Sequence, residues 1–386
     1  MPERISAVPT SFFGKGAVQL LVPELQKLGL RRALVVTDSF LYASGAAARV
    51  GEVLLAAGLE YAVYYRVAPN PTVEIVNECI TAASSLRVDL LVALGGGSAI
   101  DTAKAAGIVL ANGGRVEQYE GTDKSARPGL PIVAINTTAG TGSECTGFYI
   151  VTDPVRHSKM TMVDKNCMVR IAVNDIDFMS SMPPGLTAAT GMDALTHAIE
   201  AVLSRPATPL TDKDACWAIG TILHYLPAAV ADGGNEQART MMAYAENTAG
   251  MAFSNAGLGM VHAMAHALGG RYNLPHGVCN AVLLPYVLAF NAAQGGAAVE
   301  ARFGVIARAM ELNIPTGQAV AGVIAAVRAL SEEIGIAHSL SELKGVAPAD
   351  FDALAALALH DSCMASNPVR PTGEQVAAVY RAAYQG

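Results

Sequence analysis

Short apolar runs alternate with amphipathic stretches along the first half of the chain. The apolar runs are rich in β-branched residues and have the length of buried strands, at residues 33–38, 61–67, 89–94 and 131–136. The stretches between them carry apolar positions at helical spacing, at residues 41–57, 72–86 and 98–111. Strands that alternate with helices predict βαβ units and a parallel sheet. Residues 148–152 and 159–164 predict a hairpin beside that sheet.

The pattern changes near Met182-Pro183-Pro184-Gly185, because β-rich runs almost vanish beyond this point. Alanine-rich segments with helical spacing then follow one another to a last expected helix at residues 376–386. We therefore predict two domains. Residues 1–180 form an α/β domain and residues 181–386 an all-helical domain.

Composition excludes several classes of protein. Of the 386 residues, 52% are hydrophobic and 15% charged, which is too apolar for a disordered chain. The net charge is −7 without a basic stripe, so we expect no nucleic-acid partner. Asn280, Pro285 and Asn291 interrupt the most apolar stretch, and no leader pattern opens the chain, so we expect no membrane segment. Six scattered cysteines without a CxxC motif indicate reduced thiols in a cytoplasm.

A glycine-rich loop follows the expected strand 89–94 and opens the next helix. It contains Gly95, Gly96, Gly97 and Ser98, with Asp101 one turn later. Glycines let backbone N–H groups approach a phosphate, and a helix N-terminus favours an anion. The loop matches neither GxGxxG nor a Walker A motif. An ordinary strand-to-helix turn, with Asp101 as a first-turn acid, remains the alternative.

A second polar loop follows the strand that ends at Asn136, and it includes Thr137, Thr138 and Thr141. Ligands of parallel α/β sheets bind at the carboxyl ends of the strands, so two such loops together indicate a dinucleotide site. Asp38 ends the first strand, where a carboxylate accepts hydrogen bonds from a ribose and repels a 2′-phosphate, favouring NAD over NADP. The alternative for Asp38 is a helix N-cap.

Four histidines gather in the second half of the chain. Asp193 and His197 are spaced i,i+4, as are His262 and His266, and His276 follows in a loop. The spacing sets each pair on one helix face, and imidazole with carboxylate is a ligand set for Fe²⁺ or Zn²⁺. Hydrogen-bonded helix histidines without a metal are the alternative.

A zinc hydrolase also carries two histidines at this spacing, in the motif HExxH. Ala263 follows His262 where that motif has its glutamate, so the general base of the hydrolase is missing.

Taken together, the motifs resemble the iron-dependent, group III alcohol dehydrogenases, and among them the bacterial methanol, 1,3-propanediol and lactaldehyde–propanediol oxidoreductases. The matching segments, in order, are residues 95–104, 136–144, 186–200, 259–266, 275–277 and 366–368. The resemblance extends from about residue 10 to the C-terminal helix. It implies a Rossmann-like domain followed by an all-helical domain, an architecture shared with dehydroquinate-synthase-like enzymes.

The resemblance also implies roles for individual residues. The implied ligands of Fe²⁺, or of Zn²⁺ or another divalent metal, are Asp193, His197, His262 and His276. His266 is implied to lie near the nicotinamide and to move a proton. The implied NAD(H)-binding residues are Asp38, Gly95, Gly96, Gly97, Ser98, Asp101, Thr137, Thr138, Thr141 and Lys159. A homodimer or a larger homo-oligomer is the implied assembly.

Four residues match substrate-pocket positions: Phe148, Phe253, Arg271 and Cys363. Arg271 departs from the family, in which an aromatic residue is usual there. The implied reaction interconverts a small primary alcohol and its aldehyde. One alternative is reduction of an anionic aldehyde (sulfonate, phosphonate or carboxylate), which a cation at Arg271 would favour. The competing interpretation of Arg271 is a side chain that faces solvent. Another alternative is a glycerol-dehydrogenase-like enzyme that acts on polyols. An NAD-binding sensor is a further alternative, although an open metal site has no use in a sensor.

Overall fold

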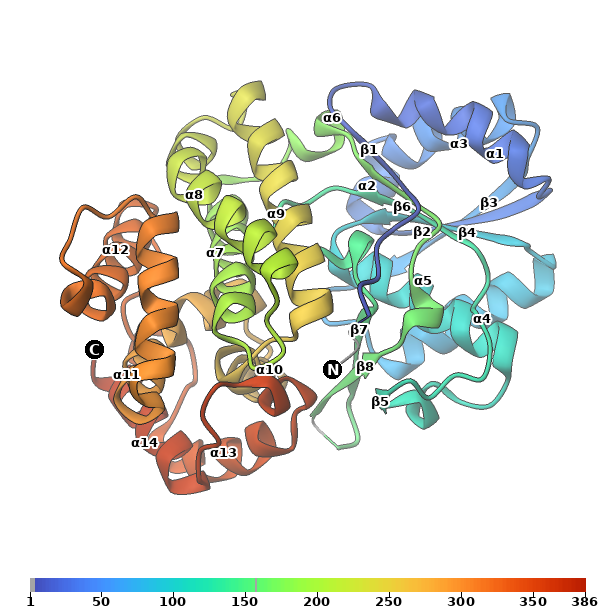
Figure 1. The fold of residues 1–386 in the computed structure, drawn as a ribbon. Coiled ribbons are helices and arrows are strands. Elements are labelled where there is room, and N and C mark those ends of the chain that lie inside the picture. Colours follow the sequence, from blue (N-terminus) through green and yellow to red (C-terminus); the bar gives the residue numbers. More distant parts are fainter. Residues whose placement is uncertain (1–3, 157) are drawn as a thin grey trace. The chain divides into compact units, whose positions relative to one another are not determined.

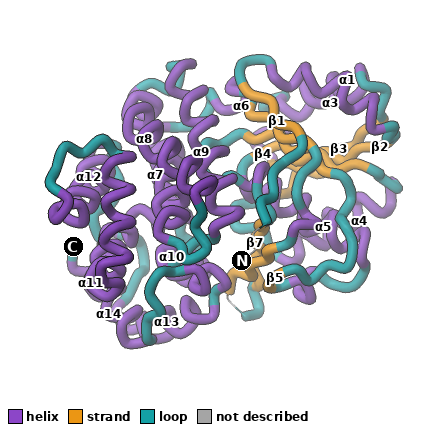
Figure 2. The backbone as a smooth tube through the Cα atoms, viewed as in Figure 1, coloured by secondary structure: helices purple, strands orange, loops and turns teal. Residues whose placement is uncertain are grey.

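The computed structural model describes residues 4–156 and 158–386, and its internal contacts divide them into two compact units. Residues 6–138 and 142–181 form one, here the sheet unit. Residues 139–141 and 182–386, with the described residues before Ser6, form the other, here the helical unit. Within the described residues, strands occur only in the sheet unit (Figure 2).

A six-stranded parallel sheet is the centre of the sheet unit (Figure 1). Its strands in spatial order are β1 (Thr10–Phe13), β9 (Ile171–Asn174), β6 (Ile132–Asn136), β4 (Leu90–Gly95), β2 (Arg32–Asp38) and β3 (Glu60–Val67). Every residue of β4 is buried, which explains its continuous apolar run, since a central parallel strand is covered on both faces.

Helices cover both faces of this sheet (Figure 1). On one face α1 (Leu21–Leu28) and α3 (Ala46–Ala56) pack against the strands through leucine and valine side chains. On the other face lie α4 (Val73–Leu86) and α5 (Gly97–Asn112). The short α2 (Ser39–Ala43) follows β2, and α6 (Ile176–Met179) follows β9.

A smaller sheet adjoins α4 and α5 and contains the expected hairpin. Strands β7 (Phe148–Asp153) and β8 (Ser158–Val163) pair antiparallel, and β5 (Gly121–Thr122) pairs with β8. Their inner side chains share a core with α4 and α5.

Two details differ from the sequence-based expectation. The prediction of a single helix at residues 41–57 is wrong. Gly45 has φ +85°, a left-handed conformation that separates α2 from α3. Strands β1 and β9 were not expected. They have four residues each, too short for a distinct alternating pattern.

The helical unit is built around α7 (Pro184–Leu203), which contacts α8, α9 and α11. The other helices are α8 (Pro209–Ala231), α9 (Glu236–Ala256), α10 (Met260–Tyr272), α11 (His276–Ala309), α12 (Ala319–Glu333), α13 (Phe351–His360) and α14 (Gly373–Gln385). Residues 191–203 of α7 are all buried, so its polar side chains must find partners inside the unit.

Single turns of 3-10 helix connect several of these elements. They lie at Ala17–Leu20, Val116–Tyr119, Ser143–Cys145, Lys165–Cys167, Thr316–Gln318, Leu340–Glu342, Pro348–Asp350 and Ser362–Ser366.

Helix α11 is long and apolar enough to cross a membrane by length and composition alone. Its backbone is non-helical at Gly296, and it packs against α7, α10 and α12. A core helix passes the same composition test, so this feature is weak evidence for a membrane span.

Candidate metal centre and cofactor loops

Two of the expected ligands, Asp193 and His197, lie one turn apart in the fully buried part of α7. Both side chains point into the same site, with 3.9 Å between Asp193 Oδ1 and His197 Nε2. The other ring nitrogen of His197, Nδ1, lies 3.2 Å from the carbonyl oxygen of Gly140. The ring of Phe253 stacks on His197 at 4.2 Å between centroids, and this fixes the imidazole plane.

The other two expected ligands come from two further helices. His262 lies in the first turn of α10, and His276 is the first residue of α11. Their Nε2 atoms each lie 3.6 Å from Asp193 Oδ1. A tetrahedral ion with bonds of about 2.1 Å has ligands about 3.4 Å apart. The ligand atoms of Asp193, His262 and His276 lie within 4.8 Å of one another, so these three residues fit a divalent metal with nitrogen and oxygen ligands. His197 lies 3.9 Å from Asp193 but is outside this group.

Burial and mutual contact set the charges of this cluster. Burial raises the pKa of Asp193, but the imidazoles of His197 and His276 outweigh it, and the pKa ends below its usual value. Burial lowers the pKa of His197 to about 3. At neutral pH Asp193 is therefore an ionised carboxylate and His197 a neutral imidazole, the forms in which these two groups bind metal.

Glu200 orients His262 from the next turn of α7. Its Oε2 lies 2.6 Å from His262 Nδ1, and its Oε1 accepts a hydrogen bond from the backbone N–H of Val261 at 2.7 Å. Burial lowers the pKa of His262, but hydrogen bonds with Asp193 and Glu200 raise it to about 9. A carboxylate behind a ligating histidine fixes the ring and its tautomer. We did not predict this role, although Glu200 follows Asp193 by seven residues and so shares its helix face.

His266 lies one turn beyond His262 and contacts a second buried carboxylate. Its Nδ1 lies 2.8 Å from Asp361 Oδ2, and its ring stacks on His276 at 5.1 Å. Burial raises the pKa of Asp361, but the charge of His266 outweighs it and holds the pKa at about 2. No pattern in the sequence indicated Asp361, which is 95 residues away from His266.

The four expected pocket residues have different surroundings in the structure. Phe253 and Cys363 lie beside the cluster, since Phe253 stacks on His197 and the backbone N–H of Cys363 donates to Asp361. Burial raises the pKa of the Cys363 thiol. Arg271 is exposed at the end of α10, with its Nε 3.4 Å from Asp350 Oδ2. Phe148 lies in the sheet unit, at the start of β7.

The expected cofactor loops lie side by side in the sheet unit. Strands β6, β4 and β2 are neighbours and parallel, so the loops that leave them meet at one edge of the sheet. The backbone N–H of Thr137 donates to the carbonyl of Gly95, and a side chain at Gly96 would come within 2.8 Å of Thr138. Gly95 has φ +152°, which few other residues adopt.

Expected cofactor residues outside these contacts have other structural partners. Asp38 caps α2 by accepting from the backbone N–H of Leu41 at 2.8 Å. Gly97 and Ser98 begin α5, Lys159 lies in β8, and Thr141 belongs to the helical unit.

Asp101 and Lys104 form a buried anchor between α5 and the segment after β6. The Asp101 carboxylate accepts from Ser143 Oγ and from the backbone N–H of Ile150. Burial nevertheless leaves its pKa raised. Lys104 Nζ, fully buried, donates to the carbonyls of Ser143, Thr146 and Phe148 at 2.6–2.8 Å. We predicted a cofactor role for Asp101 and none for Lys104. In the structure both tie α5 to the segment from Ser143 to Ile150.

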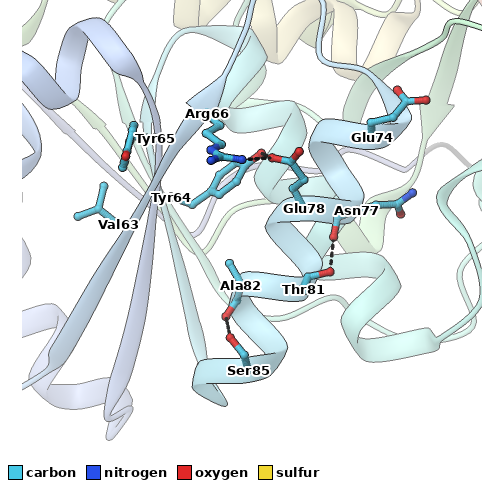
Figure 3. A pocket seen from close by; sticks show the side chains of 10 residues that line it. All are labelled: Val63, Tyr64, Tyr65, Arg66, Glu74, Asn77, Glu78, Thr81, Ala82 and Ser85. Carbon is cyan, nitrogen blue, oxygen red and sulfur yellow. Dashed lines mark hydrogen bonds and ion pairs between the residues drawn. The ribbon is translucent and has the colours of Figure 1, made fainter.

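A hollow of about 700 Å³ lies between β3 and α4, outside both candidate sites (Figure 3). Two of its polar groups pair with Glu78: Arg66 lies 3.6 Å from it, and the hydroxyl of Tyr64 donates to it. None of the residues expected to bind metal, cofactor or substrate lines it.

The chain thus combines an α/β unit built on a parallel sheet with an all-helical unit that holds a buried Asp/His cluster. Residues 9–176 match the iron-containing alcohol dehydrogenase family, and residues 187–384 match the C-terminal region of the Fe-containing alcohol dehydrogenase family. The chain belongs to this family.

Individual relatives match over the whole chain. An NAD-dependent methanol dehydrogenase of Bacillus methanolicus is 42% identical, with 97% of each chain covered. A lactaldehyde reductase of Escherichia coli is also 42% identical over the full length of both chains. The crystal structure of a 1,3-propanediol oxidoreductase superposes with a TM-score of 0.94 at 41% identity, again over both full chains. The predicted family and fold class are thus confirmed.

Proposed function

We propose that the protein interconverts a small primary alcohol and its aldehyde with NAD(H), using a divalent metal held by Asp193, His197, His262 and His276. The convergence of these four side chains from three helices carries the proposal. The names of the full-length relatives support the substrate class and the cofactor. Fe²⁺ is the metal that the family name favours, and the donor set suits Zn²⁺ as well.

Individual residues of the chain would have distinct roles in this reaction. A bound metal supplies Lewis acidity toward the substrate oxygen, and the nicotinamide supplies or accepts the hydride. Glu200 and Asp193 hold the His262 ring in place, and Phe253 holds His197. His266, oriented by Asp361, is the group that gives or takes the substrate proton.

The cofactor is proposed to bind along the loops after β2, β4 and β6. Backbone N–H groups at Gly96, Gly97 and Ser98 begin a helix and suit the pyrophosphate, while Thr137 and Thr138 border the same edge. Asp38 lies at the end of β2, where a carboxylate recognises the ribose of NAD.

Neutral short aldehydes are the proposed substrates, because Arg271 is exposed and paired with Asp350. None of the six cysteines forms a disulfide within the described residues, which supports a reducing compartment such as the cytoplasm. A homodimer or larger assembly is proposed from the family resemblance alone.

The decisive experiment follows NADH oxidation by metal-stripped protein before and after anaerobic addition of Fe²⁺ or Zn²⁺. The substrate panel pairs neutral with anionic aldehydes of equal length and includes glycerol in the reverse direction. We expect activity only with metal, and neutral aldehydes to be used best. His262→Ala should lose bound metal and activity together. A metal-free His262→Ala protein that remains active contradicts the ligand assignment, and activity confined to glycerol contradicts the substrate class.

A further inference from the structure

Asn280 lies at the centre of the ligand cluster, although it is not one of the four proposed ligands. It follows His276 by one turn of α11 and is completely buried. Its amide nitrogen, Nδ2, lies 2.6 Å from Asp193 Oδ1 and 3.1 Å from the Nε2 atoms of both His262 and His276. One amide group therefore contacts ligand atoms from α7, α10 and α11.

These contacts are of the kind that fix orientation. An amide nitrogen carries two N–H donors, and a donor directed at an ionised carboxylate makes a stronger and shorter bond than a neutral pair. The bond to Oδ1 restricts rotation of the Asp193 carboxylate. The amide has two N–H donors for three acceptors, and each Nε2 has a single lone pair, which a bound metal would use. The contact that persists beside a metal is therefore the bond to Asp193 Oδ1, because a carboxylate oxygen keeps a second lone pair.

Asparagine is also an energetically unfavourable residue at this buried position. The amide oxygen Oδ1 is buried and has no hydrogen-bond partner among the residues that the structure describes. Burying an unpaired amide oxygen costs free energy that an apolar side chain of similar size would not cost. Packing alone therefore does not account for asparagine here.

We propose that Asn280 is a positioning residue of the metal centre, which sets metal affinity by holding the Asp193 carboxylate in place beside His262 and His276. The inference rests on the ligand set proposed above. Partners that orient metal ligands typically contribute 10- to 100-fold to metal affinity, so the same range is expected for Asn280.

A matched control lies in the same helix. Asn291 is buried like Asn280, and it exchanges hydrogen bonds with Asn367 at 3.2 and 2.9 Å. Replacing either asparagine by leucine removes one buried amide from α11, but only Asn280→Leu removes contacts to the proposed ligands.

The experiment uses the full-length protein, stripped of metal and titrated with Zn²⁺ against a chromophoric chelator. In parallel, Co²⁺ is added and its visible spectrum recorded, because the spectrum reports ligand geometry. We expect Asn280→Leu to raise the Kd for Zn²⁺ about 10- to 100-fold and to change the Co²⁺ spectrum. Asn291→Leu should keep the wild-type Kd and spectrum even where it lowers the melting temperature. An Asn280→Leu protein with wild-type Kd and spectrum overturns the inference.

Asn280→Asp provides a second test that preserves side-chain shape. It places a carboxylate beside Asp193, so the metal-stripped variant should melt lower than wild type and gain more on Zn²⁺ addition, because the cation relieves the repulsion. A gain equal to that of wild type contradicts the role of Asn280. Wild-type affinity in His262→Ala, by contrast, contradicts the ligand set itself, so the two failures are distinguishable.

Discussion

At the scale of single residues, the histidines of the cluster are oriented by buried groups that contact their Nδ1 atoms. Glu200 holds His262, Gly140 holds His197, and Asp361 holds His266. Each pair joins residues at least 57 positions apart in the chain. The imidazole orientations are therefore a property of the folded helical unit, and no local segment determines them.

Asp361→Asn tests whether the orientation of His266 matters for the reaction. The substitution keeps the size of the side chain but removes the charge that fixes His266, so kcat should fall on the order of tenfold to a thousandfold. Metal content should match that of wild type, because Asp361 bonds to His266 and to the backbone N–H of Cys363, and neither residue is a proposed ligand. Wild-type kcat would contradict the proton-transfer role, and metal loss would place Asp361 in the metal centre.

At the scale of elements, the close approach of α7 and α11 sets the distance between Asp193 and His276. Gly277, the second residue of α11, makes this approach possible, because a Cβ at that position would overlap the backbone carbonyl of Ala189 in α7. Backbone cannot yield as a flexible side chain does, so any larger residue must push the two helices apart.

Gly277→Ala should therefore weaken metal binding and destabilise the protein by about 1–3 kcal/mol, the usual cost of overpacking. Gly185→Ala is the matched control, since a Cβ there meets nothing within 4 Å and alanine favours the helical backbone. The control should keep metal affinity and gain up to about 1 kcal/mol. Urea unfolding and Zn²⁺ titration of both variants measure these effects, and equal behaviour of the two would contradict the packing argument.

The order of strands and helices was largely predictable from the sequence, whereas the contacts around the site were not. Buried parallel strands are continuous apolar runs, so β2, β3, β4 and β6 were expected close to their observed bounds. The i,i+4 spacing brought Asp193 and His197 to one face. The contacts of Asn280, Asp361 and Lys104 were not predictable, because their partners come from other elements and periodicity carries no information about which helices meet.

At the scale of the whole molecule, the two units carry different candidate sites and use different buried groups to position them. The sheet unit positions its loops with the buried Asp101 and Lys104, and the helical unit positions its ligands with a network of carboxylates and amides. Cysteines are distributed over both units, and all except Cys216 are buried.

Thiol reactivity should follow this burial. Burial raises the pKa of Cys79 and of Cys167 to about 12, so at pH 8 only about one thiol in 10⁴ is ionised at either site, and the thiolate is the reactive form. Native protein treated with iodoacetamide at pH 8 should carry at most one adduct, at Cys216, and denatured protein should carry six. Mass spectrometry of the native sample checks this. Rapid modification of Cys79 or Cys167 would show that the cores open readily.

The spread of the proposed ligands along the chain has a consequence for biosynthesis. Asp193 precedes His276 by 83 residues, and a ribosome adding about 5–20 residues per second needs roughly 4–17 seconds to translate that interval. During this time the nascent chain offers only part of the donor set, and the three helices have not yet assembled. The metal that is bound is therefore determined after translation, by the complete ligand set of the folded protein and by the ions available to it.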